Sequence, residues 1–295
     1  MINFKKYKVE EIKSNDSDFP DILRRMKNPV KRLRFRGKWD SKIFENSIAI
    51  VGSRRSTRYG ADILDKFIPS LVGNKLTVVS GFMYGIDTLA HKKTIESGGM
   101  TIAVLGSGLD ICTPPENERL YMEIIENNGL VISEYEDDFK STVWSFPQRN
   151  RIVVGLSNRG VLVVEAGLKS GSLITARIAN EVGRDVYAVP GSIFSKTSSG
   201  CNQLICELKA NLVTTPEDIL HLPHQYSEEN QLKLFENVTP QEKEILDILN
   251  REPSSIDEIA RESGKSAYEI SGTLTIMGLK NIVEEDGGKF GVCKL

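Results

Sequence analysis

The chain has 295 residues, a formal net charge of −2 and an apolar fraction of 40%. This length accommodates one large domain with one or two small ones, and the composition is that of an ordinary globular protein. The near-zero net charge excludes a global polycation that binds nucleic acid without specific sites. Four cysteines without a CxxC pair, and only three histidines, argue against a zinc site, so we expect no metal and no cofactor.

Charge is distributed unevenly along the chain, with a net of +6 over residues 1–40 and −5 over residues 236–295. The first residues lack the apolar stretch of a signal peptide, and no apolar run reaches the roughly 18 residues that a membrane span needs. We therefore expect a cytoplasmic protein with no membrane segment.

Residues 1–40 are predicted to form a short basic N-terminal segment. Within it, residues 31–36 alternate cations with apolar residues, as a short strand does. Because lysine and arginine blunt the edges of sheets, this pattern favours a solvated edge strand. A basic arm beside a nucleic acid is the alternative.

The pattern over residues 41–220 predicts one α/β domain. Short apolar strands alternate with amphipathic helices, which implies a Rossmann-like, doubly wound and mostly parallel sheet with helices on both faces. The expected strands are residues 48–52, 76–81, 101–106, 130–133, 160–165, 185–189 and 211–213, and the expected helices are residues 59–72, 86–97, 116–127, 172–182 and 200–209.

Residues 221–238 are polar and predict a linker, and residues 239–295 predict a small C-terminal winged-helix domain. Its expected elements are helices at 240–250, from 255 onward and at 266–279, and a hairpin at 282–292. The third helix contains no Arg or Lys before Lys280, whereas a helix that reads a DNA groove carries basic or amide side chains. We therefore expect this domain to contact protein rather than duplex DNA.

Small residues stand at the carboxyl ends of the expected strands, the edge at which parallel α/β sheets bind ligands. Glycine there lets a ligand approach the backbone closely, so these ends indicate a phosphate-lined cleft. The glycine-bearing ends are Gly52 with Ser53, Ser80 with Gly81, the turn at 106–108, and Pro190 with Gly191.

The loop at 52–57 is neither a P-loop nor a dinucleotide fingerprint. It does offer backbone donors, a hydroxyl and the guanidinium of Arg54, which can bind phosphate in a bidentate fork. A surface turn with solvated arginines has the same composition and is the alternative for this loop.

Residues 170–176 follow a buried strand at 161–164 and open a helix with serine and glycine, where backbone N–H groups and the helix dipole favour a phosphate. Lys169 lies beside that position. The loop at 199–202 is a second small-residue helix start, which can serve as a phosphate cradle or simply as a cap.

Upstream of these, Phe146 can stack on a base or pack in the core. Arg149 and Arg151 would share one side of an extended segment, with Asn150 facing the other way.

Three titratable residues accompany these motifs. Asp87 is expected at the N-cap or in the first turn of its helix. His91 is expected to be a packed helix histidine, because the sequence pairs it with no nucleophile. Glu165 would repel a phosphate unless an arginine paired with it, and we expect a structural pairing rather than catalysis.

In this order, the motifs closely resemble the family of DNA processing protein A, also called DprA or Smf. The resemblance covers about residues 30–220 and is carried by many dispersed matches. They include residues 49–54, 78–81, 85–87, 101–105, 146–151, 163–166, 170–176, 188–191 and 200–202.

The resemblance implies a non-enzymatic single-stranded DNA-binding recombination mediator. Such a protein forms a homodimer, protects incoming DNA and loads the recombinase RecA during natural transformation. From the motifs and the resemblance together, the predicted DNA-binding residues are Gly52, Ser53, Arg54, Ser80, Gly81, Phe146, Arg149, Asn150, Lys169, Ser170, Gly171, Ser172 and Thr175.

The chain departs from the family pattern at Phe82, Met83 and Tyr84, where alanine and arginine are usual. One cation is lost, and Tyr84 offers a ring for stacking. Residues 1–40 are also too few for the N-terminal helical module that is common in the family.

A nucleotide-binding enzyme or sensor is the alternative function. The fold resembles that of phosphoribohydrolases of the lysine-decarboxylase-like family, which use a Pro-Gly-Gly-x-Gly-Thr loop and a nearby glutamate. Residues 170–172 replace that loop here, which argues against the enzyme.

Overall fold

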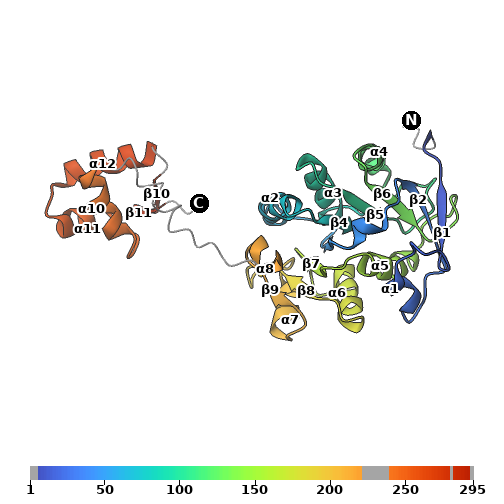
Figure 1. Ribbon diagram of the computed structural model, residues 1–295. Coiled ribbons are helices and arrows are strands. Elements are labelled where there is room, and N and C mark those ends of the chain that lie inside the picture. The colour runs from blue at the N-terminus through green and yellow to red at the C-terminus, as the bar shows by residue number, and fades with distance from the viewer. Residues whose placement is uncertain (1–5, 221–238, 280–281, 293–295) are drawn as a thin grey trace. The chain divides into compact units, whose positions relative to one another are not determined.

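The computed structural model describes residues 6–220, 239–279 and 282–292 (Figure 1). The chain divides into two compact units, Met1–Pro223 and His224–Leu295. The predicted linker at 221–238 lies outside the described residues. In the described ranges, no helix is long and apolar enough to cross a membrane.

The first unit is built on a nine-stranded sheet of order β1-β2-β6-β5-β4-β3-β7-β8-β9. Its strands are β1 (Glu10–Lys13), β2 (Arg32–Gly37), β3 (Ser47–Val51), β4 (Thr77–Ser80), β5 (Thr101–Val104), β6 (Leu130–Ser133), β7 (Val161–Val163), β8 (Val186–Ala188) and β9 (Asn211–Leu212). Its helices are α1 (Asp21–Arg25), α2 (Arg58–Gly73), α3 (Ile86–Glu96), α4 (Glu118–Glu126), α5 (Ser145–Gly155), α6 (Gly171–Glu181), α7 (Ser199–Cys206) and α8 (Pro216–Leu220), with short 3₁₀ helices η2 (Ser41–Phe44) and η3 (Pro115–Asn117).

All neighbouring strands from β6 to β9 are parallel, which confirms the predicted fold class. The chain adds β4, β5 and β6 outward from β3, then crosses back to place β7 on the other side of β3. Doubly wound sheets bind ligands at such a reversal of strand order, outside the carboxyl ends of the strands. The topology therefore points to the ends of β3 and β7.

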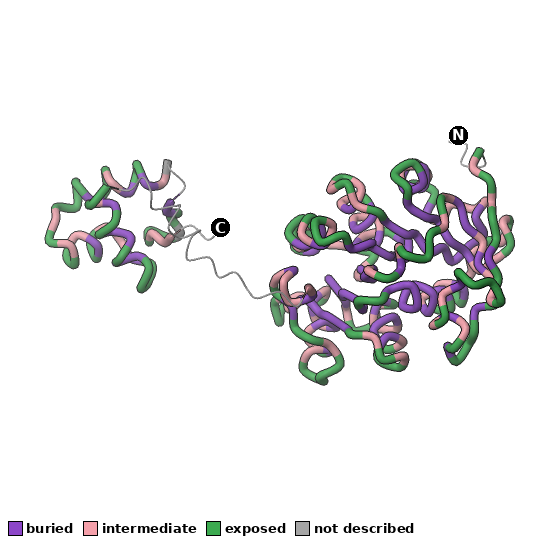
Figure 2. Tube along the Cα trace, in the orientation of Figure 1, coloured by how far each residue is buried: buried purple, intermediate pink, exposed green. Residues whose placement is uncertain are grey.

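Helices cover both faces of the sheet, with α2, α3 and α4 on one face and α1, α5, α6 and α7 on the other (Figure 1). Alternate residues of β3 supply the two cores: Ala49 joins one apolar cluster with residues of α5 and α6, and Ile50 joins another with residues of α2 and α3. Figure 2 shows the strands buried between these layers. This arrangement explains why the central strands are apolar on both faces.

The short elements β1, α1 and α8 were not predicted, because each has only four or five residues and offers little periodicity. The strand prediction at 31–36 was correct, but its interpretation as an edge strand was wrong. β2 lies inside the sheet and pairs in antiparallel fashion with both β1 and β6.

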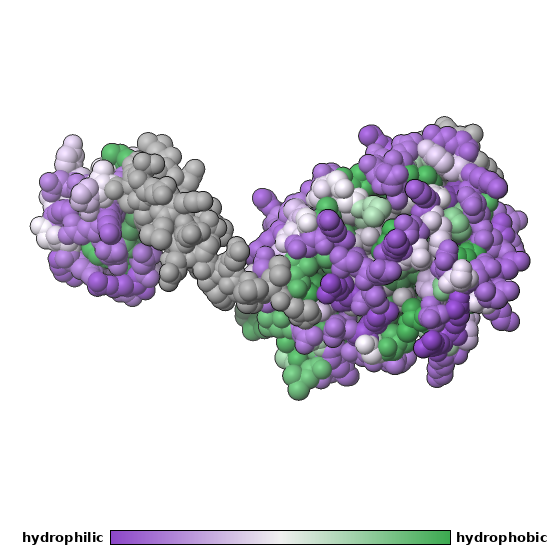
Figure 3. Space-filling view, viewed as in Figure 1, coloured by the Kyte–Doolittle hydropathy of each residue, from purple (hydrophilic) through white to green (hydrophobic). Residues whose placement is uncertain are grey.

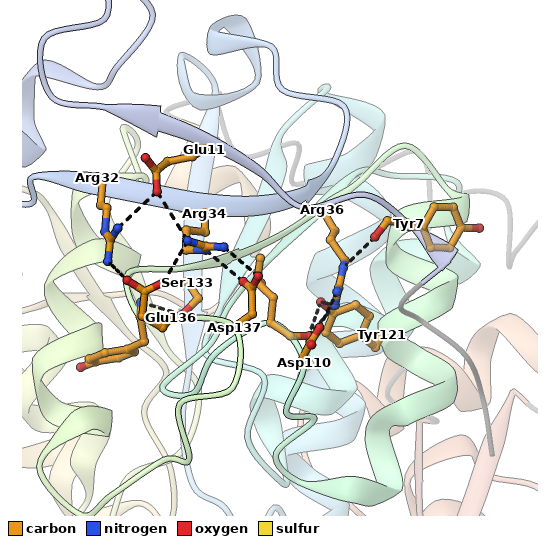
Figure 4. Close-up of polar contacts among 12 residues, drawn as sticks. Tyr7, Glu11, Arg32, Arg34, Arg36, Asp110, Tyr121, Ser133, Glu136 and Asp137 are labelled. Carbon is orange, nitrogen blue, oxygen red and sulfur yellow. Dashed lines mark hydrogen bonds and ion pairs between the residues drawn. The ribbon is translucent and has the colours of Figure 1, made fainter.

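The arginines of β2 are bound by carboxylates rather than solvated (Figure 4). Arg34 donates to both carboxylate oxygens of Asp137, at 2.9 and 2.7 Å. Arg36 is only 2% exposed and donates to Asp110 at 2.6 Å, to the Leu109 carbonyl at 2.6 Å and to the Tyr121 hydroxyl at 3.1 Å. The alternating arginines of β2 therefore form ion pairs within the protein.

The second unit has the predicted winged-helix fold. Its elements are α10 (Pro240–Leu249), α11 (Ile256–Ser263), α12 (Ala267–Leu279), β10 (Val283–Asp286) and β11 (Lys289–Val292). Thr239 and Ser255 each begin a helix with a capping box, closed by Glu242 and Glu258 respectively. The three helices share a core of their own.

We expect Arg36→Ala to lower the free energy of unfolding by about 3 kcal/mol, because it leaves the partly buried Asp110 carboxylate and the buried Leu109 carbonyl without their donor. Urea unfolding of the wild type and the variant measures the difference. The matched control is Arg119→Ala, in an exposed pair with Glu123, which should change stability by less than about 1 kcal/mol. Equal effects of the two changes would contradict the assigned role of Arg36.

Candidate functional site

A cleft of about 840 Å³ opens at the carboxyl ends of the central strands. The loops after β3, β4, β7 and β8 form its walls, together with the first turns of α5 and α6. All but one of the predicted binding residues line it: Gly52, Ser53, Arg54, Gly81, Phe146, Arg149, Asn150, Lys169, Ser170, Gly171, Ser172 and Thr175. The fold thus gathers in one cleft residues that are far apart in the chain and that the sequence had marked as candidates.

Ser80 is the exception. It is buried, and its hydroxyl donates to the Ile50 carbonyl at 2.6 Å, which ties β4 to β3. Its described contacts are those of a structural residue of the sheet.

The loop after β3 holds Arg54 at the mouth of the cleft. The Ser53 hydroxyl accepts from the backbone N–H of Arg55 at 3.1 Å, and the Ser53 carbonyl accepts from the N–H of Ile86 at 3.1 Å. The exposed Arg54 guanidinium lies 5.3 Å from the centre of the Phe146 ring, within cation–π range. The guanidinium of Arg54 and the ring of Phe146 therefore lie side by side in the cleft.

The segment at 146–151 was expected to be extended, and this expectation was wrong. It forms the start of α5, with Pro147 in the first turn, where no N–H is needed for the helix. Because a helix turns 100° per residue, Arg149 and Arg151 point in different directions instead of sharing a side. The overlooked signal was this first-turn proline followed by the apolar residues at 152–154.

Arg149 is buried beneath the cleft. Its guanidinium donates to the carbonyl oxygens of Gly81 and Val104, at the ends of β4 and β5. A side chain at position 81 would not fit, since its Cβ would lie 2.5 Å from the Asp87 carboxylate and 2.6 Å from the guanidinium of Arg149. Arg149 therefore supports the cleft floor, and little of it is open to a ligand.

Asp87 lies in the first turn of α3, as predicted, with Gly85 as the N-cap. Burial raises the pKa of the Asp87 carboxyl to about 6, although the Arg149 guanidinium and the Met83 N–H oppose that shift. Burial likewise lowers the pKa of Arg149 to about 10. The cleft thus contains a carboxyl group that titrates near neutrality.

The opposite wall is the N-terminus of α6. Ser170 caps the helix, with its hydroxyl accepting from the Ser172 N–H at 3.4 Å and lying 2.7 Å from the Ser172 hydroxyl. Lys169 is exposed beside it. Such a helix start, with a cation beside it, favours an anion.

Sequence reasoning missed Arg55 and Lys196, two exposed cations that also line the cleft. Lys196 lies in the loop after β8. The sequence had indicated this loop only through Pro190 and Gly191, at the end of the expected strand. With Arg54 and Lys169, they make four exposed cations, and Asp87 is the one carboxylate among the lining residues. The electrostatics of the cleft therefore favour a polyanion.

Glu165, at the end of β7, is 1% exposed and held by threonines rather than by an arginine. Its carboxylate accepts from the Thr57 N–H at 2.9 Å, from the Thr57 hydroxyl at 2.6 Å and from the Thr197 hydroxyl at 3.3 Å. It thereby fastens the loops after β3 and β8 to each other, which is a structural pairing.

His91 is fully buried in α3. Its Nδ1 lies 2.6 Å from the Thr101 hydroxyl, and burial lowers the pKa of its imidazole to about 3. The ring is therefore neutral at physiological pH, and it is absent from the cleft lining. At the loop 199–202, the N–H of Gly200 donates to the Ala166 carbonyl at 2.7 Å, and the N-cap residue Ser198 makes no side-chain cap hydrogen bond.

Comparison with known proteins identifies relatives for both units. The family model of DNA recombination-mediator protein A matches residues 10–223, and that of the DprA winged helix domain matches residues 235–289. DNA processing protein DprA of Streptococcus pneumoniae is 45% identical over 205 residues, which span 70% of this chain and 71% of that protein. Protein Smf of Synechocystis is 33% identical, over 93% of this chain and 77% of its own length.

Two solved structures are similar to the first unit. The X-ray structure of DprA from Streptococcus pneumoniae superposes with a TM-score of 0.67 at 41% identity, and covers 74% of this chain and 75% of that one. DNA processing protein A from Helicobacter pylori, whose structure concerns its single-stranded DNA binding mode, gives 0.64 at 30% identity, over 75% of this chain and 97% of that one.

Proposed function

Because this chain belongs to the family of DNA recombination-mediator protein A, we propose that it is a cytoplasmic single-stranded DNA-binding recombination mediator, which protects incoming DNA and loads RecA during natural transformation. The observation that carries the proposal is the cleft at the topological switch, with four exposed cations and a ring beside them. Single-strand binding proteins combine such a cationic groove with aromatic platforms for the bases.

In this proposal, phosphates bind at Arg54, at Lys169 and at the start of α6, and a base stacks on Phe146. Asn150 and Thr175 line the path between these points. Because the contacts go to the backbone and to ring faces, we expect little sequence specificity.

We propose binding rather than catalysis at this site. A catalytic carboxylate needs access to its substrate, whereas Glu165 is buried and engaged by Thr57 and Thr197. Asp87 is buried beside Arg149, and the hydroxyl nearest to it, that of Ser80, is fully buried and donates to the Ile50 carbonyl, so it is not accessible to a substrate.

A homodimer is the second part of the proposal. Figure 3 shows hydrophobic side chains gathered over α7. Leu208 is 93% exposed just after α7, and Leu212 is 51% exposed on β9, the last strand in the sheet order. Exposed apolar residues beside an open sheet edge favour association with a second chain.

RecA is the partner proposed for the mediator activity, and the winged-helix unit is proposed to contact protein. The exposed positions of α12 include Tyr268 and Ile276, and its described residues carry no lysine or arginine. A helix of this composition lacks the cations that phosphate contacts in a DNA groove require.

We expect Arg54→Glu to abolish most binding of a labelled single-stranded oligonucleotide, because it replaces a phosphate-binding cation with an anion. Fluorescence anisotropy across a salt series should give a wild-type slope of about −2 in log affinity against log salt if about three phosphates are held. Arg119→Glu, on α4, is the control and should bind as the wild type does. Undiminished binding by Arg54→Glu would contradict the proposed path.

We expect DNA binding to strengthen as the pH falls from about 7.5 to about 5.5, with a limit near tenfold per unit of pKa shift. Phosphates in the cleft disfavour the ionised carboxyl of Asp87. They therefore raise the pKa of Asp87 above the value of about 6 that it has in the protein without DNA, and DNA binding is accompanied by the uptake of a proton. Anisotropy titrations at several pH values measure the effect. Asp87→Asn should flatten the profile, and an unchanged profile in that variant would exclude Asp87 as its cause.

We expect Leu208→Arg to shift the molecule from dimer to monomer, because a desolvated charge would face the apolar partner surface. Light scattering after size exclusion measures the mass. Ile276→Arg, an apolar-to-arginine change in the second unit, is the control and should leave the mass unchanged. A monomeric wild type, or a dimeric Leu208→Arg, would refute the assignment of this surface.

A further inference from the structure

A second pocket of about 540 Å³ lies next to the first turns of α5. Helix α5 contributes to both cavities: Phe146 and Asn150 line the main cleft, whereas Gln148 and Arg151 line the second pocket. The other wall of the second pocket is the segment between α1 and β2, and the remaining lining residues are Asn28, Pro29, Lys31, Arg32 and Glu134. The ribbon shows α1 beside α5 on the same face of the sheet (Figure 1).

Arg151 gives this pocket an unused hydrogen-bonding capacity. The residue is 8% exposed, and its Nη2 donates to both carboxylate oxygens of Glu134, at 2.6 and 2.8 Å. Its Nε and Nη1 have no hydrogen-bond partner among the described residues. Buried guanidinium nitrogens are normally hydrogen-bonded, so Arg151, which lines the pocket, has donor capacity that the described residues do not use.

The charges around the pocket favour an anion. Arg151 neutralises Glu134, and Arg32 is paired with Glu11 and Glu136 on its other side. Lys31 is exposed, and no carboxylate lies within ion-pair distance of it in the described part of the chain. An uncompensated ammonium therefore stands at the mouth of the pocket.

Trp144 directly precedes α5 and follows Val143, which lines the main cleft. It is 55% exposed, although its ring packs edge-on against Tyr135 at 6.0 Å and in a tilted arrangement against Phe139 at 5.9 Å. Tyr135 and Phe139 stack on each other at 4.4 Å, and this stacked pair supports the indole ring of Trp144. The Tyr135 hydroxyl is 3.5 Å from Oε1 of Gln148, so this aromatic support reaches the second pocket.

We propose that the DNA strand in the main cleft continues over the N-terminal turn of α5, stacks a base on Trp144 and places a phosphate in the second pocket, at Lys31 and Arg151. This inference rests on the proposed function and extends it to a longer binding path. Cation, exposed ring and cation follow one another along the path, as a nucleic-acid strand of alternating phosphates and bases requires. Continuity with the main cleft favours this occupant over a separate small anion.

The test is an anisotropy series with labelled homothymidine strands of about 4 to 16 nucleotides, the usual range of single-strand site sizes. The variants are Lys31→Glu, Trp144→Ala and Trp144→Phe, with Lys92→Glu on α3 as the charge control. Thermal melting of each variant verifies folding. A strand of the longest length with abasic sites in place of the bases separates stacking from backbone contacts.

Lys31→Glu should weaken the binding of long strands, and the size of their salt slope should fall by about 0.7 for the lost phosphate. The shortest strands should bind it as they bind the wild type. Trp144→Ala should weaken binding of the long strand about fivefold or more but leave the abasic strand unaffected, and Trp144→Phe should retain most of the affinity.

Unchanged affinity of long strands for both Lys31→Glu and Trp144→Ala would overturn this inference, while Arg54-dependent binding of short strands would leave the proposed function standing. Equal losses at every length would also overturn it, because the second pocket would then not be a distal subsite. Failure of the wild type to bind any strand would instead refute the proposed function itself. Competition by free inorganic phosphate with no dependence on strand length would identify a small-anion site.

Discussion

The edge of the sheet that forms the cleft depends on the buried guanidinium of Arg149. A buried charge is costly unless it is fully hydrogen-bonded. Here the carbonyl oxygens at the ends of β4 and β5 accept hydrogen bonds from the guanidinium, and the Asp87 carboxyl lies nearby. This contact anchors α5 to the strand ends. The anchored helix then presents Phe146 and Asn150 to the main cleft, and Gln148 and Arg151 to the second pocket.

Glu165 is the acidic counterpart on the other side of the cleft. Its carboxylate is satisfied by Thr57 and Thr197, so the loops that carry Arg54 and Lys196 are held without using the cations themselves. Both buried charges are thus satisfied by local groups of the protein. The four exposed cations consequently remain available to a ligand, which explains how a chain of slightly negative net charge can have a positively charged cleft.

The sheet and most of the cleft could be predicted because they depend on local signals. Apolar runs mark buried strands, and the rule for strand ends selects residues that the parallel topology must bring to one edge. How deeply each residue of that edge is buried could not be predicted, because nothing in the sequence distinguishes Arg54 from Arg149. One is exposed and the other is buried under a glycine whose neighbours leave no room for a Cβ. The interior position of β2 was missed for a similar reason, since the partners of its arginines, Asp110 and Asp137, are 74 and 103 residues away in sequence.

The place of β2 in the sheet also has a consequence for how the protein is made. Phe35 pairs with Ile132, and Ala49 in the next strand pairs with Val161, so neither early strand has both neighbours until the ribosome has added roughly a hundred further residues. At usual translation rates, that delay is about 5 to 20 seconds. During this interval β2 has only β1 beside it and β3 has only β4, so one edge of each strand is still unpaired. The late strands β7, β8 and β9 then complete the sheet, and the loops after β7 and β8 complete the cleft.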